Sequence, residues 1–275
     1  MLSHPLLPKL KQLRLSGIAA TLDERAAQAS ANAIRPVDFL ALLLEDELDR
    51  RQQARHDRFV RRAGFQQLKL LADFDFDAAP ALDRSLVMAM ANCQFVRAHE
   101  NWILCGPTGV GKSHLAAAIG FEAIKLGYTV LWTSAHELLA DLFAARADDS
   151  YRRKLRSIVN VDLLIIDDFG LRPVATQGAQ DLYDIIQKRY ERGSIILTSN
   201  RAPAEWDQVF GDALLASAAL DRLTHHARIT CLSGQSYRQR HRRSREESVP
   251  DVAEPQPTPQ ASRDGPKQMR NADKL

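Results

Sequence analysis

The stretch of sequence that decides the fold is Gly106-Pro107-Thr108-Gly109-Val110-Gly111-Lys112-Ser113. It matches the pattern G-x-x-x-x-G-K-[ST] at every fixed position, and it lies between an apolar run at 102–105 and an amphipathic run at 113–125. Glycines let a backbone approach phosphate oxygens with its N–H groups turned inward, and the N-terminus of the following helix adds partial positive charge. We therefore predict that this stretch wraps the phosphates of ATP, with Lys112 on the β- and γ-phosphates and Ser113 as a ligand of Mg²⁺.

Three further polar residues follow two apolar runs downstream. The run 161–166 ends in Asp167 and Asp168, and the run 194–198 ends just before Asn200. We predict that Asp167 holds the water shell of Mg²⁺ and that Asp168 acts as a base or orients the attacking water. Asn200 is the candidate for a polar sensor of the γ-phosphate. The alternatives are an acidic turn for the two carboxylates and a turn-capping role for the asparagine.

The arrangement of apolar runs indicates the architecture. From residue 101 onward, short β-type runs alternate with longer amphipathic stretches, whereas residues 1–73 read as helical. Such alternation predicts an α/β P-loop fold of three layers, with a parallel sheet between helices, preceded by a small all-helical domain. The predicted divisions are a helical domain for partner or DNA interaction at 1–73, a linker and lead-in helix at 74–100, an ATPase domain at 101–238, and a basic, then disordered tail at 239–275.

Composition narrows the setting of the protein. The formal net charge is only +3, and the three cysteines share no metal-ligand spacing, which is typical of a reduced cytoplasmic protein. No apolar run reaches the roughly 18 residues of a transmembrane helix. The first residues also lack the pattern of a secretory signal. We therefore predict a cytoplasmic protein with no membrane partner.

Two basic segments are candidates for DNA contact. One is a block of arginines at helical spacing between residues 50 and 62, and the other consists of Arg152, Arg153 and Lys154, directly after Tyr151. Clustered cations bind phosphates without regard to sequence, and a tyrosine can stack on a base. A solvated helix face explains the first segment equally well, because acidic residues stand nearby at 45–49. The same alternative stays open for the second segment.

Several later segments together suggest a family. They are Ile165-Ile166-Asp167-Asp168-Phe169-Gly170, Gln187-Lys188-Arg189-Tyr190-Glu191, Ile196-Leu197-Thr198-Ser199-Asn200, Asp221-Arg222-Leu223-Thr224-His225-His226 and Gly234-Gln235-Ser236-Tyr237-Arg238. In this order they resemble AAA+ ATPases of the initiator and helicase-loader branch. The closer resemblance is to the IstB-type transposition helper ATPases of bacterial insertion sequences, which are similar to the DnaC helicase loaders.

The resemblance implies a function that depends on assembly. Such proteins form homo-oligomers on double-stranded DNA, mark a target site and are engaged by a transposase that stimulates ATP hydrolysis. In that pattern Arg222 is an arginine finger, which acts in trans on the nucleotide of a neighbouring subunit. An ion pair within the helix is the alternative for Arg222. The family lacks a full lid domain, so the role of Arg238 stays open.

Two other functions compete with the transposition helper. A replicative helicase loader of the DnaC type would share the fold, and genomic adjacency to a transposase gene would separate the two. A small-molecule kinase would share the P-loop. No arginine-rich lid follows the 113–125 run, however, and Asp168 with Asn200 suits water activation better than acceptor binding.

Overall fold

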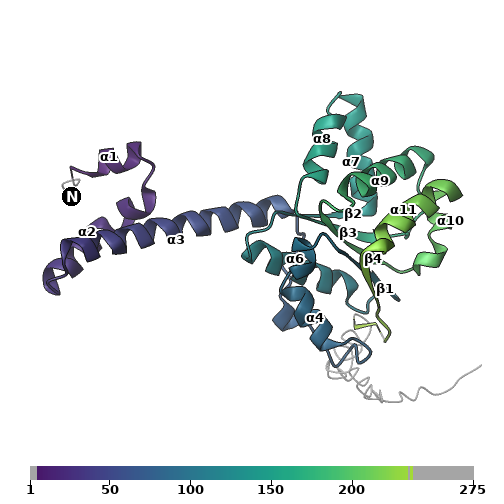
Figure 1. Ribbon diagram of the computed structural model, residues 1–275, viewed down its shortest axis with the longest axis horizontal. Coiled ribbons are helices and arrows are strands. Elements are labelled where there is room, and N and C mark those ends of the chain that lie inside the picture. Colours follow the sequence, from purple (N-terminus) through teal and green to yellow (C-terminus); the bar gives the residue numbers. More distant parts are fainter. Residues whose placement is uncertain (1–4, 235, 238–275) are drawn as a thin grey trace, which may run out of the picture.

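The computed structural model describes residues 5–234, 236 and 237. In this part of the chain one sheet carries helices on both faces, and a long helix joins it to a helical arm (Figure 1). No helix in the described part combines the length and the apolar character that crossing a bilayer requires. The predicted tail at 239–275 lies outside the described residues, as does Arg238.

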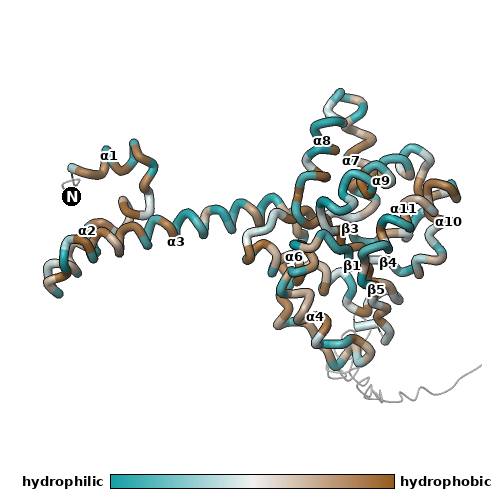
Figure 2. The backbone as a smooth tube through the Cα atoms, viewed as in Figure 1, coloured by the Kyte–Doolittle hydropathy of each residue, from teal (hydrophilic) through white to brown (hydrophobic). Residues whose placement is uncertain are grey.

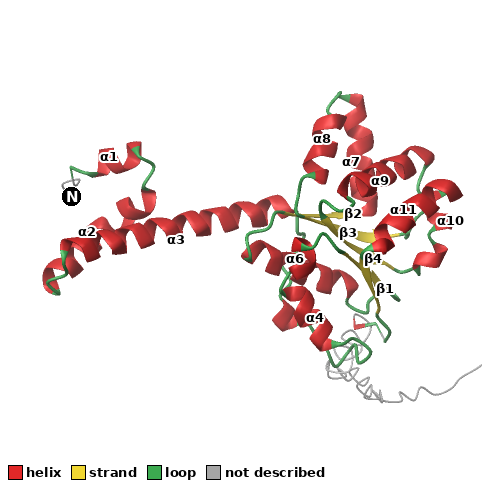
Figure 3. Cartoon of the chain, in the orientation of Figure 1, coloured by secondary structure: helices red, strands yellow, loops and turns green. Residues whose placement is uncertain are grey.

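The sheet is parallel and has the order β2-β3-β4-β1-β5 (Figure 3). The strands are β1 (Asn101–Cys105), β2 (Val130–Ser134), β3 (Leu163–Phe169), β4 (Ser194–Ser199) and β5 (Ala227–Cys231). The strands β1, β3 and β4 overlap the apolar runs named above, and the predicted three-layer AAA+ fold is confirmed. The sequence does not predict β5, because this edge strand is mostly exposed and therefore has no apolar run.

Helices connect and cover the strands. The helices are α1 (Leu7–Gln12), α2 (Ser16–Ala31), α3 (Pro36–Ala63), η1 (Leu71–Asp73), α4 (Arg84–Ala91), α5 (Gln94–Arg97), α6 (Lys112–Lys125), α7 (Ala135–Ala147), α8 (Tyr151–Val159), α9 (Thr176–Arg189), η2 (Pro203–Glu205), α10 (Asp207–Phe210) and α11 (Ala213–His225). Parallel strands need such crossovers, because a tight turn cannot return the chain to the end of the sheet at which the next strand begins.

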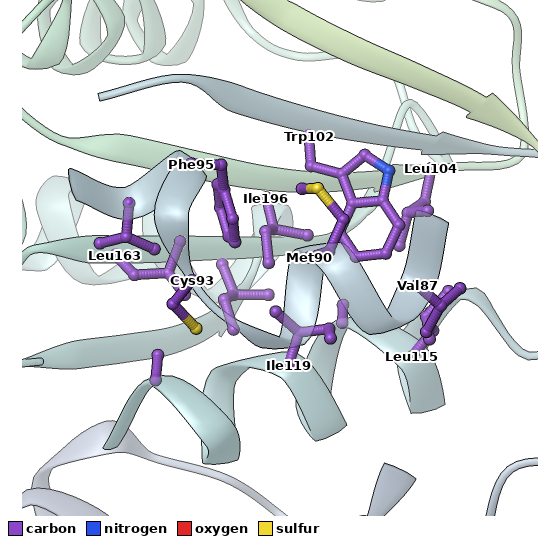
Figure 4. Close-up of a cluster of buried hydrophobic side chains, with 14 of the residues drawn as sticks. Val87, Met90, Cys93, Phe95, Trp102, Leu104, Leu115, Ile119, Leu163 and Ile196 are labelled. Atoms are coloured by element: carbon purple, nitrogen blue, oxygen red, sulfur yellow. The ribbon is translucent and has the colours of Figure 1, made fainter. Parts of the chain in front are cut away.

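The core consists of two apolar layers, one on each face of the sheet. Successive residues of a strand point to opposite faces, so Trp102 and Leu104 of β1 join one layer while Ile103 joins the other. Figure 4 shows Trp102 and Leu104 packed with Leu115 and other side chains of the first layer. Burial on both faces explains why the central strands read as continuous apolar runs.

The arm (residues 7–51) packs differently. It lies at the far end of α3 from the sheet, and the middle of α3 is largely hydrophilic (Figures 1 and 2). Only Ile18, Leu22 and Leu43 form its buried apolar cluster. At Gly17 the helices α2 and α3 come so close that a Cβ atom would lie 2.6 Å from Cα of Glu47. The predicted small helical unit is therefore a helix pair with a small core.

The predicted linker region contributes to the core of the predicted ATPase unit (residues 101–238). Phe74, Ala79 and Leu82 are buried in the layer that contains Trp102, and Phe74 lies against Gly111 of the P-loop (residues 106–113). The end of α3 also packs here, through Ala63. The division of the chain into domains remains a prediction.

Candidate nucleotide-binding site

The P-loop connects β1 with α6, and its glycines hold backbone conformations that other residues rarely adopt. Gly106 and Gly109 have φ angles of 137° and 88°. A Cβ atom on Gly106 would lie 2.1 Å from the carbonyl oxygen of Leu232, and one on Gly109 would lie 2.3 Å from Oγ of Ser236. Glycine is therefore required at both positions for conformation and for space.

The other members of the loop differ in exposure. Pro107 and Thr108 are exposed at its tip, whereas Val110 is buried and anchors the loop in the core. Lys112 and Ser113 open α6, where the unpaired N–H groups of the first turn favour an anion. The predicted loop and helix are thus present as a unit.

Lys112 is held inside the loop. Its Nζ donates to the carbonyl oxygens of Gly106 and Pro107, each at 2.7 Å, and its side chain is buried. Burial lowers the pKa of Lys112, and the nearby negative charges of Asp168 and Asp167 act in the opposite direction. The structure therefore brings this cation and both predicted carboxylates to one place.

Asp167 is the centre of a hydrogen-bond network between three elements. Its Oδ1 accepts from the Ser113 hydroxyl at 2.8 Å and also from the Thr198 hydroxyl. A serine hydroxyl beside a carboxylate supplies the oxygen ligands that Mg²⁺ prefers. These residues therefore fit a Mg²⁺ ion bound with nucleotide phosphates.

Asp168 has a backbone conformation unlike that of its neighbours. Its φ is +55°, and the pairing of β3 with β4 is irregular between Ile166 and Phe169. Its N–H donates to the Thr198 hydroxyl at 3.1 Å, and its side chain is exposed. Non-glycine residues with positive φ are strained and cluster at functional sites. Asp168 is thus exposed directly beside the Asp167 network.

Thr198 is a site residue that the sequence analysis missed. Its hydroxyl contacts both acidic residues, donating to Asp167 and accepting from the N–H of Asp168. A hydroxyl within an otherwise apolar buried run was the available signal. The predicted Asn200 lies two residues further on, exposed at the end of β4.

A second missed contact comes from the end of the described chain. Leu232 donates its N–H to Cys105 at 2.8 Å, and Tyr237 donates its N–H to the carbonyl of Gly109 at 3.0 Å. This segment follows β5, which the sequence did not predict, so its return to the P-loop could not be anticipated.

Arg222 is not brought to this site. Asn101, the first residue of β1, donates hydrogen bonds to the carbonyls of Leu223 and His226. The end of α11 therefore lies at the N-terminal end of β1. The P-loop begins at the C-terminal end of β1, about 13 Å away along this five-residue strand. Arg222 donates to Ala218 and lies over the Tyr183 ring, and no ion pair of Arg222 exists among the described residues. The alternative of an ion pair within the helix is therefore not observed.

The predicted DNA-binding residues lie in the first turns of α8. Arg152 and Arg153 are exposed, whereas Lys154 pairs with Asp141 at 2.5 Å. Tyr151 is also engaged, because its hydroxyl donates to Asp181 at 2.7 Å and Arg146 lies over its ring. The prediction that Tyr151 stacks on a base is therefore not supported, since its ring is already covered.

The arginine block on α3 divides in a similar way. Arg51 pairs with Glu47 at 2.6 Å, and Arg55 donates to the carbonyl of Gly127 at 3.3 Å. Arg58, Arg61 and Arg62 are exposed. A solvated helix face with local partners thus accounts for the first part of the block only.

The fold and the site together define a P-loop protein of the AAA+ class that binds ATP. The chain belongs to the family of IstB-like ATP-binding proteins, whose model matches residues 8–245. The resemblance predicted from the motifs is therefore confirmed.

Relatives from insertion sequences match nearly the whole chain. One is described as an ATP-binding protein of insertion sequence IS21 from Pseudomonas aeruginosa; it is 38% identical over 240 residues, covering 87% of this chain and 91% of the relative. Another, described as an ATP-binding protein of IS5376 from Geobacillus stearothermophilus, is 37% identical, with coverage of 87% and 96%.

Solved structures share the fold. DnaI matches with a TM-score of 0.52 at 24% identity, covering 60% of this chain and 91% of DnaI. AMPPCP-bound DnaA from Aquifex aeolicus matches with a TM-score of 0.51 at 21% identity, covering 67% and 56%. At these identities the likeness concerns the fold alone.

Proposed function

We propose that this chain is an ATP-dependent transposition helper, which hydrolyses ATP with Mg²⁺, assembles on double-stranded DNA in the cytoplasm and is engaged by a transposase. The observation that carries the proposal is the convergence of Lys112, Ser113 and Asp167 at the end of β1 and β3. The insertion-sequence setting of the relatives supports the choice of partner.

Mg²⁺ would be held by the Ser113 hydroxyl and, through its water shell, by Asp167. When bound, it supplies positive charge that offsets the charge of the phosphate oxygens. Thr198 keeps the Asp167 carboxylate in place, because its hydroxyl donates to Oδ1. Lys112 adds the side-chain cation of the loop, and it would exchange its carbonyl partners for phosphate oxygens.

Hydrolysis needs a water molecule activated beside the γ-phosphate. Asp168 is exposed next to the metal-holding network, so its carboxylate can accept the proton of that water. Asn200, directly after the adjacent strand β4, would orient the water or sense the γ-phosphate. The positive φ of Asp168 costs free energy of folding, which suits a residue whose side chain must be held at one place in the site.

Arg222 would complete the site of a neighbouring subunit. It lies far from its own P-loop and is partly exposed on α11. A cation delivered by a neighbour would stabilise the charge that develops on the γ-phosphate. Hydrolysis would then depend on assembly of the homo-oligomer. Arg152 and Arg153 are our candidates for contacts with the DNA backbone.

The test combines phosphate release with electron microscopy of the full chain, with ATP and with or without duplex DNA. We expect rings or filaments on DNA, free phosphate as the product, and longer-lived assemblies for Asp168→Asn, which spares Asp167. Asp162→Asn, at the other end of β3, is the control variant. A monomer under all conditions, or a phosphorylated small molecule as the product, would contradict the proposal.

A further inference from the structure

Three side chains with metal-binding atoms meet near the N-terminal end of β1, away from the P-loop. Glu191 stands just after α9, and His225 and His226 stand at the end of α11. Their ligand atoms all lie within 4.8 Å of one another, and all three residues are exposed. None of the three takes part in the nucleotide site, so the cluster has no role in the proposed hydrolysis.

The fold holds this cluster together from two directions. The helices α9 and α11 pack side by side, and both end here. Glu191 has a φ of +58°, which turns the chain sharply after α9. The Tyr190 hydroxyl bonds Nδ1 of His225 at 2.6 Å, and the rings of His225 and His226 lie 4.1 Å apart between centroids. His225 is therefore placed by a contact outside the cluster, and His226 lies between His225 and Glu191, with its Nε2 3.7 Å from the Glu191 carboxylate.

The local charges favour a cation. Two helix C-termini bring the negative ends of their dipoles to this point, and Glu191 adds a carboxylate. Arg189 and Arg222 line the same pocket as Glu191 and His226, but each is directed elsewhere. Arg222 donates back along α11 to Ala218, and Arg189 donates to backbone carbonyls that include Val159 and Ser194. A positive ion beside Glu191 would thus gain from the helix ends without facing either guanidinium group directly.

We propose that Glu191, His225 and His226 form a binding site for a divalent transition-metal cation of the Zn²⁺ class. Two imidazoles and one carboxylate are a common ligand set for Zn²⁺, with water in the remaining position, whereas Mg²⁺ prefers oxygen ligands alone. Ligand atoms around tetrahedral Zn²⁺ lie about 3.3 Å apart, so small rotations of these exposed side chains close the site.

The hydrogen bond from Tyr190 gives the site a supporting residue. Metal-bound histidines commonly use the second ring nitrogen to bond an outer partner, which fixes the ring and raises the affinity for the metal. The Tyr190 hydroxyl is such a partner for His225, because a hydroxyl can either donate or accept. Tyr190→Phe should therefore weaken binding without removing a ligand.

The experiment is calorimetric titration of ZnCl₂ into the purified, chelator-treated full chain without nucleotide, in a Cys231→Ser background. This background removes an exposed thiol that would compete for the metal. We expect one equivalent to bind with micromolar affinity, a loss of about 100-fold for His226→Ala and for His225→Ala, and a loss of about 10-fold for Tyr190→Phe. His136→Ala, which removes an exposed histidine of α7, is the matched control and should change nothing.

A second measurement guards against variants that do not fold. The melting temperature of the full chain should rise with added Zn²⁺, because a ligand that binds only the folded state stabilises it. The rise should be absent for Glu191→Gln and present for His136→Ala. Zinc binding that survives in both histidine variants, or affinity weaker than about 100 µM for the unchanged ligand set, would overturn the proposal. Thiolate-type absorption with Co²⁺ would also overturn it, because the ligands would then be cysteines.

Discussion

The arm and the ATPase unit are stabilised in different ways, although one helix, α3, belongs to both. In the ATPase unit two apolar layers enclose a parallel sheet, and even the strand residues beside the P-loop are buried. In the arm only three apolar side chains are buried together. There, polar contacts also join α2 and α3, since buried Glu47 accepts from the N–H of Gly17 at 2.6 Å and Asp46 pairs with Arg25 at 2.7 Å.

The difference teaches where specificity and where stability originate. Apolar burial stabilises in proportion to area, so the sheet supports a strained site at Asp168. A buried carboxylate, in contrast, costs free energy unless it is hydrogen-bonded. It therefore favours the one pairing of the helices that provides its partners, but it adds little to the free energy of unfolding. We expect the arm to be the less stable region and to respond to changes that leave the nucleotide site intact.

The largest expected effect separates function from stability in the ATPase unit. Lys112→Ala should weaken ATP binding by about 100-fold or more, because the loop loses its side-chain cation. Calorimetry with ATP measures the effect. Lys125→Ala, at the exposed end of the same helix, should bind as the unchanged chain does. Equal ATP affinity for both variants would remove the P-loop assignment.

The same contrast explains what the sequence could and could not predict. The motif from Gly106 to Ser113 and the strand that ends in Asp167 can be recognised locally. Each combines a characteristic pattern of residues with side chains of a defined chemistry. The strand β5 and the contacts of Tyr237 with Gly109 depend on tertiary packing, which leaves no local pattern. The arm is predicted as helical, but its pairing through Glu47 is not, because a charged residue in a helix normally indicates a solvent-exposed face.

A smaller effect should break the arm alone. Gly17→Val places side-chain atoms where a Cβ atom would already lie 2.6 Å from Cα of Glu47, so α2 and α3 must separate. The cost should be about 1–3 kcal/mol, the usual range for overpacking. The measurement is urea unfolding by circular dichroism together with tryptophan emission, because all three tryptophans lie in the ATPase unit.

We expect a helical transition of the Gly17→Val chain at lower urea that tryptophan emission does not follow, with ATP affinity unchanged. Ala20→Val introduces the same side chain on the exposed face of α2 and should move the transition much less, by no more than the roughly 0.7 kcal/mol difference in helix propensity. If both signals shift together in the Gly17→Val chain, the arm and the ATPase unit unfold as one, and the comparison fails.

The third test asks which region binds DNA. Arg152→Glu with Arg153→Glu should weaken duplex binding by about 10-fold and lower the slope of log K against log salt by about one unit per lost contact. The matched variant changes Arg58, Arg61 and Arg62 to Glu. Fluorescence anisotropy across a salt series compares the two. A slope that is kept by the α8 variant and lost by the α3 variant would move the DNA surface to the base of the arm.

The smallest expected effect is a loss of arm stability in acid. Hydrogen bonds from Arg25, and then from Thr21, lower the pKa of Asp46 from 3.8 to about 2. Because the folded-state pKa is depressed, the stabilisation is complete above about pH 4 and is lost as the pH falls toward 2. Glu47 acts in the same direction: burial raises its pKa, but bonds from Arg51 and from two backbone N–H groups leave it lowered.

A shift of almost two units corresponds to at most about 2.5 kcal/mol, and partial exposure of Arg25 reduces this to about 1 kcal/mol. The helical transition of the arm should therefore move to lower urea between pH 5 and pH 3. Asp46→Asn should reduce this dependence on pH, because one of the two titrating carboxylates is gone. Asp38→Asn, from an exposed pair with Arg35, is the control and should keep the dependence. An arm equally stable at both pH values would show that the charges of Asp46 and Glu47 do not hold α2 against α3, and it would point to the apolar cluster around Ile18, Leu22 and Leu43 instead.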